Sequence, residues 1–354
     1  MTQRSGREAP ASLATLGVAA LYAGLTLILT YPTAWNLSTA IVGYPGEDNV
    51  YSVWEGWWFK VALLDWHASP ATVPVLYYPL GLFQTMLTAT PLTELTQAPL
   101  VALFDPVVAY NVVFLFSYFL TALFTYLLCY ELTGNRWASI AGGFVFAFSP
   151  FRTIHAAAGH FTQIMTYWFP LYALFMLRVI RRPTGRDAVL AGIFMACSSL
   201  VSLMHTAYFV IPFTLATLIY GYLRDRREFL SPARLRYVLL ALGTGAVILV
   251  PFYAPFLLQR LGGEWGFLDR AGTAEYAADL LAFLTPSPYH PLFSRLPIQP
   301  FLEQVMSGYP FENLVYVGWI PLFLAWCGRR GATARMWIGL AVATALLALG
   351  PFHY

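Results

Sequence analysis

The sequence predicts an all-α polytopic membrane protein, and three observations lead to this fold class. The first is composition: of the 354 residues, 58% are hydrophobic and only 10% are charged, whereas soluble globular domains are about 25% charged. The second is a series of apolar runs that approach the length of about 20 residues needed to cross a bilayer as a helix. The third is the uneven distribution of arginine between the segments that separate these runs.

Nine apolar runs are predicted as transmembrane helices. In chain order they cover residues 12–31, 106–130, 137–149, 161–179, 187–204, 206–222, 237–257, 313–327 and 336–350. The run 137–149 is short, so it is expected to be tilted, partial or extended by its neighbours. A further apolar stretch, 90–104, is interrupted by Pro91, Glu94 and Pro99 and is predicted as a re-entrant or interfacial helix.

The arginines predict the orientation. With the N-terminus in the cytoplasm and the spans alternating, all but five of the 20 Lys and Arg residues lie on the inner side. This asymmetry follows the positive-inside rule and predicts a plasma-membrane protein with a cytoplasmic N-terminus. No small-residue cleavage site follows the first run, so an uncleaved first helix is expected. A single transmembrane domain then covers 1–350, and residues 351–354 form an outer-side end.

Chemically versatile side chains gather on the predicted outer side. All six histidines and most of the 17 carboxylates fall there, and many of them lie in two long segments, 32–105 and 258–312. Either the outer face is the working face, or long outer loops simply contain more of every residue type. No Walker loop, dinucleotide fingerprint, zinc-ligand spacing or nucleophile elbow is present, and no nucleic-acid partner is expected.

The first outer segment carries an acidic pair followed by an amphipathic stretch. In GYPGEDNV, residues 43–50, Glu47 and Asp48 occupy a turn rich in glycine and proline. The next stretch, VWEGWWFKVALLDW, spaces its tryptophans along one helical face and keeps Glu55 and Lys60 off that face. It is predicted either as an interfacial helix with Trp at headgroup depth or as a packed helix of a small outer domain. The acidic pair is either functional or merely solvated.

Other outer segments carry candidate binding groups. SPFRTIHAAAGHFTQ, residues 149–163, contributes Arg152, His155 and His160, whose donors suit a phosphate. The alternative for Arg152 is a lipid headgroup or a carboxylate such as Asp105. A metal site built on the two histidines is disfavoured because residues i and i+5 do not share a helical face.

Two pairs of residues complete the candidates. In LYYPLGL, residues 76–82, Tyr77 and Tyr78 either stack on a sugar ring or anchor the loop. Arg260 and Arg270, in the second long outer segment, are further candidates for holding an anionic headgroup.

Five stretches together resemble the GT-C superfamily of membrane glycosyltransferases. They cover residues 46–64, 76–81, 135–175, 278–293 and 312–325, and they look like a poorly characterised group of large bacterial and archaeal multi-pass proteins. The resemblance implies a polyprenyl-phosphate sugar as donor and an outer-face acceptor in the cell envelope, either a glycan, a lipid or a protein. By position, it implies that Asp48 is the catalytic base, with Glu47 second.

The same resemblance gives the other candidates a role. A departing polyprenyl phosphate needs positive charge nearby, which Arg152, His155 or Arg260 would supply. A divalent metal is compatible with this chemistry, although no ligand cluster demands one. The chain stops at LALGPFHY, so it is either a fragment or a short relative. A transporter or flippase of a lipid-linked or polar substrate, and a non-catalytic envelope scaffold, remain the alternative functions.

Overall fold

The computed structural model describes residues 13–83, 85–262, 277–286, 295, 315–331 and 333–350, and most of these residues are helical. The first part of the chain forms α1 (Leu13–Leu29), α2 (Asn49–Lys60), α3 (Met86–Ala89), α4 (Leu92–Leu103), α5 (Pro106–Thr133), α6 (Arg136–Ala147), α7 (Pro150–Ala157) and α8 (Phe161–Ile164). The rest forms α9 (Trp168–Arg181), α10 (Gly185–Val201), α11 (Leu203–His205), α12 (Ile211–Arg224), α13 (Arg226–Phe229), α14 (Pro232–Leu261), α16 (Trp319–Gly328) and α17 (Ala334–Ala348). One small antiparallel hairpin pairs β1 (Thr72–Val73) with β2 (Leu82–Phe83).

Each apolar run that the sequence predicts to span contains a helix in the described residues. Three continuous helices are long and apolar enough to cross a membrane: α5, the segment Leu203–Arg224 that includes α12, and α14. The apolar helices α1, α16 and α17 are shorter. The structure is therefore that of a helical membrane protein, and the count of nine spans stays a prediction.

Side-chain caps start several of the long helices. The Asp105 carboxylate accepts the Val107 and Val108 backbone N–H groups at the start of α5. Asn135, Thr184 and Ser231 cap α6, α10 and α14 in the same way. Because the first N–H groups of a helix have no partner within it, these oxygens fix the first residue of each helix.

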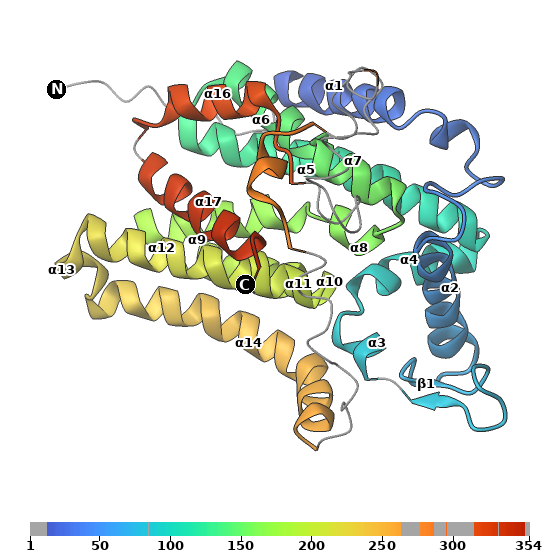
Figure 1. Ribbon diagram of the computed structural model, residues 1–354. Coiled ribbons are helices and arrows are strands. Elements are labelled where there is room, and N and C mark those ends of the chain that lie inside the picture. Colours follow the sequence, from blue (N-terminus) through green and yellow to red (C-terminus); the bar gives the residue numbers. More distant parts are fainter. Residues whose placement is uncertain are drawn as a thin grey trace.

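The bundle is built around α9. In Figure 1 the long helices run across the picture, and α13 lies at the opposite end from α2, α3, α4 and β1. Buried side chains of α9 pack against α10, α12 and α14; the central ones are Met176, Leu177, Val179, Ala188, Ala191, Phe213, Val238 and Ala241. Small residues on α10 allow the neighbouring backbone to approach closely, as is common between helices in membranes.

Charged residues from separate predicted inner segments meet at one end of this bundle. Arg178 and Arg182 at the end of α9 both pair with Glu131 at the end of α5, the first at 2.6 Å. Asp187, at the start of α10, lies 3.9 Å from Arg178. Two short connections that the charge pattern assigns to the inner side, α5–α6 and α9–α10, therefore lie together.

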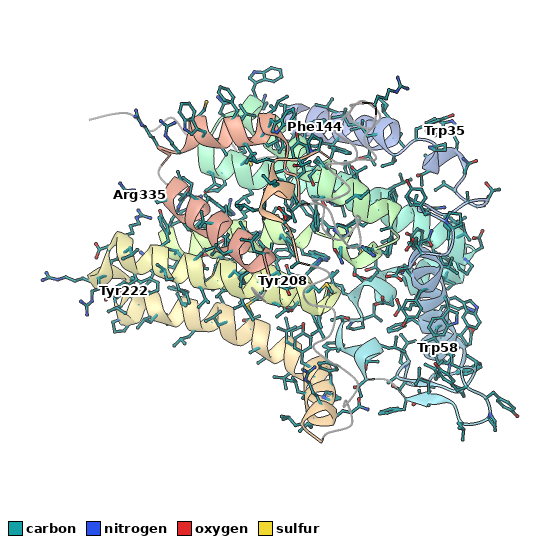
Figure 2. The ribbon with its side chains drawn as sticks, in the orientation of Figure 1. Trp35, Trp58, Phe144, Tyr208, Tyr222 and Arg335 are labelled. Atoms are coloured by element: carbon teal, nitrogen blue, oxygen red, sulfur yellow. The ribbon has the colours of Figure 1, made fainter. Side chains whose placement is uncertain are left out.

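The segment between α1 and α5, which the charge pattern predicts to lie outside, forms a small packed unit. Helix α2 begins at Asn49, earlier than the tryptophan stripe suggests, and packs against α4. Trp58 is 1% exposed and donates through Nε1 to the Pro70 carbonyl at 2.8 Å; Figure 2 shows it in this unit. These contacts agree with a packed helix of a small outer domain, and a position at the membrane interface stays a prediction. The stretch 90–104 forms α4, with Pro99 inside the helix.

The contact between α10 and α14 has no room for a side chain at Gly192. A Cβ atom added there would lie 2.6 Å from Thr244 Cβ and 2.9 Å from Gly245 N, and it would also meet the Ala241 carbonyl. By contrast, a Cβ atom at Gly243, also on α14, would meet nothing within 4 Å.

We therefore expect Gly192→Ala to lower the unfolding temperature of the purified protein in detergent by several degrees, because the two helices must move apart. Gly243→Ala is the matched control, and it should leave the temperature unchanged or raise it, since alanine favours a helix over glycine by about 1 kcal/mol. Equal unfolding temperatures for the two variants would show that the α10–α14 contact tolerates a methyl group.

Candidate functional site

Two turns that are far apart in the sequence dock on each other. We call residues 43–49 the acidic turn and residues 155–160 the histidine turn. The Tyr44 N–H donates to the Ala157 carbonyl at 2.8 Å, which joins the two turns through their backbones. The buried Asn49 side chain donates to the carbonyls of Val42, at 3.0 Å, and Tyr44, at 3.4 Å, and so holds the acidic turn closed.

Glycine at position 159 is required for this docking. Gly159 has a φ of +74°, a conformation that residues with a side chain rarely adopt. A Cβ atom at this position would lie 3.1 Å from Asn49 Cα and would also meet the Asn49 backbone nitrogen. A side chain here would therefore push the histidine turn away from the start of α2.

The docking brings Asp48, His160 and His155 into one row. Asp48 Oδ2 lies 4.0 Å from His160 Nε2, and the Asp48 side chain is 72% exposed. Its carboxylate makes no capping hydrogen bond to α2, so it faces solvent at the rim of the site. His160 Nδ1 lies 2.7 Å from His155 Nδ1, so one of the two nitrogens carries the hydrogen between them. Glu47 is exposed beside Asp48.

His155 forms the buried end of this row. Its side chain is almost fully buried, and burial together with the neighbouring His160 lowers the pKa of His155 to about 3. It is therefore neutral at physiological pH and can orient His160 through the shared hydrogen. The two side chains meet although residues i and i+5 do not share a helical face, because α7 ends at Ala157 and His160 lies beyond the turn.

Arg152 lies in α7, but its guanidinium points into the protein. It is 1% exposed and donates to main-chain carbonyls of Ala147, Ser117 and Ile164, as well as to the Ser117 hydroxyl. It also lies over the Tyr118 ring, 4.3 Å from its centroid. Arg152 therefore connects α7 to α5 and to the ends of α6 and α8. Its guanidinium is buried and does not face the solvent-exposed Asp48 side chain.

The remaining sequence candidates lie elsewhere. Arg260 is exposed in the last turn of α14, next to Gln259, whose side chain hydrogen-bonds Thr85 before α3. Tyr77 and Tyr78, between β1 and β2, are 74% and 85% exposed. Arg270 lies outside the described residues. No contact between these residues and Asp48 is found among the described residues.

Two further carboxyl groups, those of Glu55 and Glu94, lie on α2 and α4, which pack against each other. Burial, and then the charge of Asp48, raise the pKa of Glu55 to about 7, although a hydrogen bond from Tyr51 opposes the shift. Glu94 of α4 is 5% exposed, and its Oε2 has no hydrogen-bond partner. Burial and the neighbouring Glu55 raise the pKa of Glu94 well above its ordinary value.

Sequence reasoning did not single out Asn49, Gly159 or Glu94 as parts of a site. The signals were weak but present: Asn49 directly follows the acidic pair, and Gly159 directly precedes a histidine. Glu94 was noticed only as an interruption of an apolar stretch. Within the described ranges, no group of three or more His, Cys, Asp and Glu side chains could hold a metal ion.

Comparison with protein families gives one match. Residues 13–352 match the model of a domain of unknown function, DUF6311. The chain belongs to the DUF6311 family. No curated protein matches it.

Comparison with solved structures gives a distant match for this DUF6311 protein. It is similar to archaeal oligosaccharyltransferase AglB from Archaeoglobus fulgidus, whose structure was solved in complex with an inhibitory peptide and a dolichol-phosphate. The TM-score is 0.48 and the sequence identity is 16%. The similarity covers 95% of this chain and 50% of AglB, so the chain spans about half the length of that relative.

Arg152→Met tests whether Arg152 acts mainly in folding. Methionine fills much of the same space but leaves buried carbonyls without a donor, at a cost of about 1–3 kcal/mol for each unsatisfied group. We expect the unfolding temperature to fall clearly, whereas Arg260→Met, at an exposed position, should not change it. An Arg152→Met protein with unchanged stability and weakened binding of a polyprenyl phosphate would instead assign Arg152 to ligand binding.

Glu94→Gln tests the buried carboxyl group through pH. Because the folded-state pKa of Glu94 lies above the unfolded value, its stabilising contribution is present at low pH and is lost as pH rises towards the folded-state pKa. Glutamine stays neutral, so the gain in unfolding temperature of Glu94→Gln over the wild type should grow between about pH 5 and about pH 8. Asp65→Asn, at a partly exposed carboxylate paired with Lys60, is the control and should show no such growth.

Proposed function

We propose that this DUF6311 protein is a membrane glycosyltransferase that moves a sugar from a polyprenyl-phosphate carrier to an acceptor on the outer face of the plasma membrane. In this proposal Asp48 is the catalytic base. His160, oriented by His155, stabilises the departing phosphate. Arg260 is a further candidate for the phosphate, and the sugar and the acceptor are left open.

One observation carries the proposal: the acidic turn and the histidine turn meet at the rim of the outer unit. An exposed carboxylate and an imidazole lie 4.0 Å apart there, each held by a separate backbone segment. A carboxylate that accepts a proton and a ring N–H that donates to an anion are the two groups that transfer from a phosphate-linked sugar needs. The resemblance of the motifs to GT-C enzymes adds independent support for this chemistry.

The proposed reaction is a single displacement. The acceptor hydroxyl or amine attacks the anomeric carbon while Asp48 takes its proton. The bond between the anomeric carbon and the phosphate oxygen breaks, and the electron pair leaves with the polyprenyl phosphate. Negative charge grows on that oxygen in the transition state, which is where a hydrogen bond from His160 would act. Glu47, exposed beside Asp48, can draw the acceptor's donor groups towards the base.

The test measures sugar release by protein in lipid from a panel of radiolabelled polyprenyl-phosphate sugars. Asp48→Asn should lower turnover of the accepted donor by about 10²-fold or more, because general base catalysis contributes about 10²–10⁴-fold. Asp65→Asn, on the same segment but beyond the end of α2, should behave like the wild type.

Gly159→Ala supplies a second variant without a change of charge. It should lower turnover by separating the two turns while Asp48 and His160 remain present. Equal turnover by the wild type and Asp48→Asn would reject Asp48 as the base. If no donor is hydrolysed or transferred, but a lipid-linked sugar is moved across the bilayer, the protein is a flippase instead.

A further inference from the structure

The hydrogen between His155 and His160 can lie on either ring, and the two choices give His160 opposite roles. The two Nδ1 atoms are 2.7 Å apart, and a neutral imidazole has one N–H donor and one bare acceptor nitrogen. If His160 donates from Nδ1, its Nε2 is bare and faces Asp48 as an acceptor. If His160 accepts at Nδ1, its Nε2 carries the hydrogen and faces Asp48 as a donor.

The backbone of the histidine turn holds the two rings against each other. The His160 N–H donates to the His155 carbonyl at 2.9 Å, and the Gly159 N–H donates to the Ala156 carbonyl at 3.2 Å. The centroids of the two rings lie 5.0 Å apart. The contact between the rings is therefore a property of the turn itself.

The rim of the row favours a hydrogen on Nε2 of His160. Asp48 Oδ2 lies 4.0 Å from this nitrogen, and a carboxylate oxygen only accepts hydrogen bonds. A bare Nε2 would place two acceptors opposite each other. An N–H at Nε2 instead places a positive partial charge opposite a negative oxygen. Because 4.0 Å exceeds the length of a hydrogen bond, this contribution is electrostatic.

The buried end of the row leads to the same assignment. His155 is 1% exposed, and its Nε2 has no hydrogen-bond partner among the described residues. If His155 accepted at Nδ1, its Nε2 would carry a hydrogen and become a buried donor without an acceptor. Orphaned N–H groups are rarer in proteins than acceptors that stay under-satisfied, and a buried one costs its full desolvation. A bare Nε2 on His155 avoids this donor.

We infer that His155 donates its Nδ1 hydrogen to His160 Nδ1 and thereby keeps the hydrogen of His160 on Nε2. This inference rests on the proposed function and adds the direction of the hydrogen bonds in that site. The row runs one way, from the His155 N–H to His160 and from the His160 N–H to an anionic oxygen at the rim. A phosphate oxygen fits this end of the row, because it accepts hydrogen bonds and offers none.

This order separates the roles of Asp48 and His160. A His160 ring with a bare Nε2 would be a second base beside Asp48 and would repel a phosphate oxygen. With the hydrogen on Nε2, neutral His160 donates to that oxygen, and Asp48 alone takes the proton of the attacking hydroxyl or amine. His155 acts through His160 and does not touch the substrate, so it is a positioning residue.

The first arm of the test reads the hydrogen positions by nitrogen NMR of the full protein in lipid, with isotope-labelled histidine. At about pH 8, above the ordinary pKa of histidine, a nitrogen with a hydrogen and a bare one resonate far apart. Coupling to the ring hydrogens tells Nδ1 from Nε2, and His155→Asn and His160→Asn assign the signals. We expect a hydrogen on Nε2 of His160 and on Nδ1 of His155. A hydrogen on His160 Nδ1 would overturn the inference.

His155→Asn and His155→Leu form a matched pair. The two replacements are similar in size, but only the asparagine amide can donate from near the position of the His155 Nδ1. In His155→Asn, His160 should keep its hydrogen on Nε2. In His155→Leu, His160 should show a mixture of the two neutral forms. If His160 still carries its hydrogen on Nε2 alone in His155→Leu, the role of His155 is overturned.

Asp48→Asn tests which end of the row sets the order. Both histidines should keep their hydrogen positions in this variant, because the buried end of the row is intact. A shift of the His160 hydrogen to Nδ1 would show that Asp48 sets the order and would overturn the role of His155. His67→Asn, at an exposed histidine beyond the end of α2, is the control and should change neither signal.

The second arm measures sugar release by the same variants. His155→Leu should release sugar about tenfold more slowly than the wild type, the effect of about one hydrogen bond, and His155→Asn should recover most of the rate. The loss should fall on kcat rather than on KM for the donor, because the His160 contact strengthens as charge grows on the leaving oxygen. Equal rates for the two variants would contradict the inference.

The two arms distinguish the failure of this inference from the failure of the proposed function. If the wild type releases no sugar from any donor but the hydrogen positions are as expected, the glycosyltransferase proposal fails and only the order of the row stands. If the protein is active but His160 carries its hydrogen on Nδ1, the inference is overturned and His160 faces Asp48 as an acceptor.

Discussion

The contact between the acidic turn and the histidine turn is the constraint on which the rest of the site depends. A single backbone hydrogen bond, from Tyr44 to the Ala157 carbonyl, joins segments that are more than a hundred residues apart. It is possible only because Gly159 has no Cβ atom to collide with Asn49. Without it, Asp48 would sit on a separate outer unit, and His160 would belong to a loop of the bundle. With it, Asp48 Oδ2 lies 4.0 Å from His160 Nε2.

Arg152 connects α7, which leads into the histidine turn, to other helices of the bundle. Its guanidinium donates to carbonyl groups of α5, of the end of α6 and of α8. The segment that carries both histidines is therefore attached to three other helices. A buried arginine is costly unless its donors find acceptors, and three main-chain carbonyls accept from the two terminal nitrogens of Arg152, while its Nε is buried without a hydrogen-bond partner. The position of His160 thus depends on Arg152, whose side chain is buried and does not face Asp48.

Stability and chemistry conflict at the α2–α4 contact. Apolar side chains such as Trp58 and Ala98 would pack this contact well along its full length, yet Glu94 is buried among them without a cation. Such a residue lowers the free energy of unfolding at high pH. Residues that break the local packing rules in this way tend to lie at functional sites, and Glu94 packs against α2, the helix that begins directly after Asp48.

The sequence by itself determined the helical membrane class and the position of a helix in each long apolar run, because apolar length is a local property. Only the tertiary structure decided where the candidate site residues lie and what they contact. In the sequence, Arg152 and His155 are both candidate hydrogen-bond donors. In the structure the Arg152 side chain is buried in the bundle, whereas His155 contacts His160 because α7 ends at Ala157. Likewise Glu94 interrupts an apolar stretch, and its burial depends on the packing of α4 on α2. These roles depend on neighbours distant in the chain, which residue spacing does not encode.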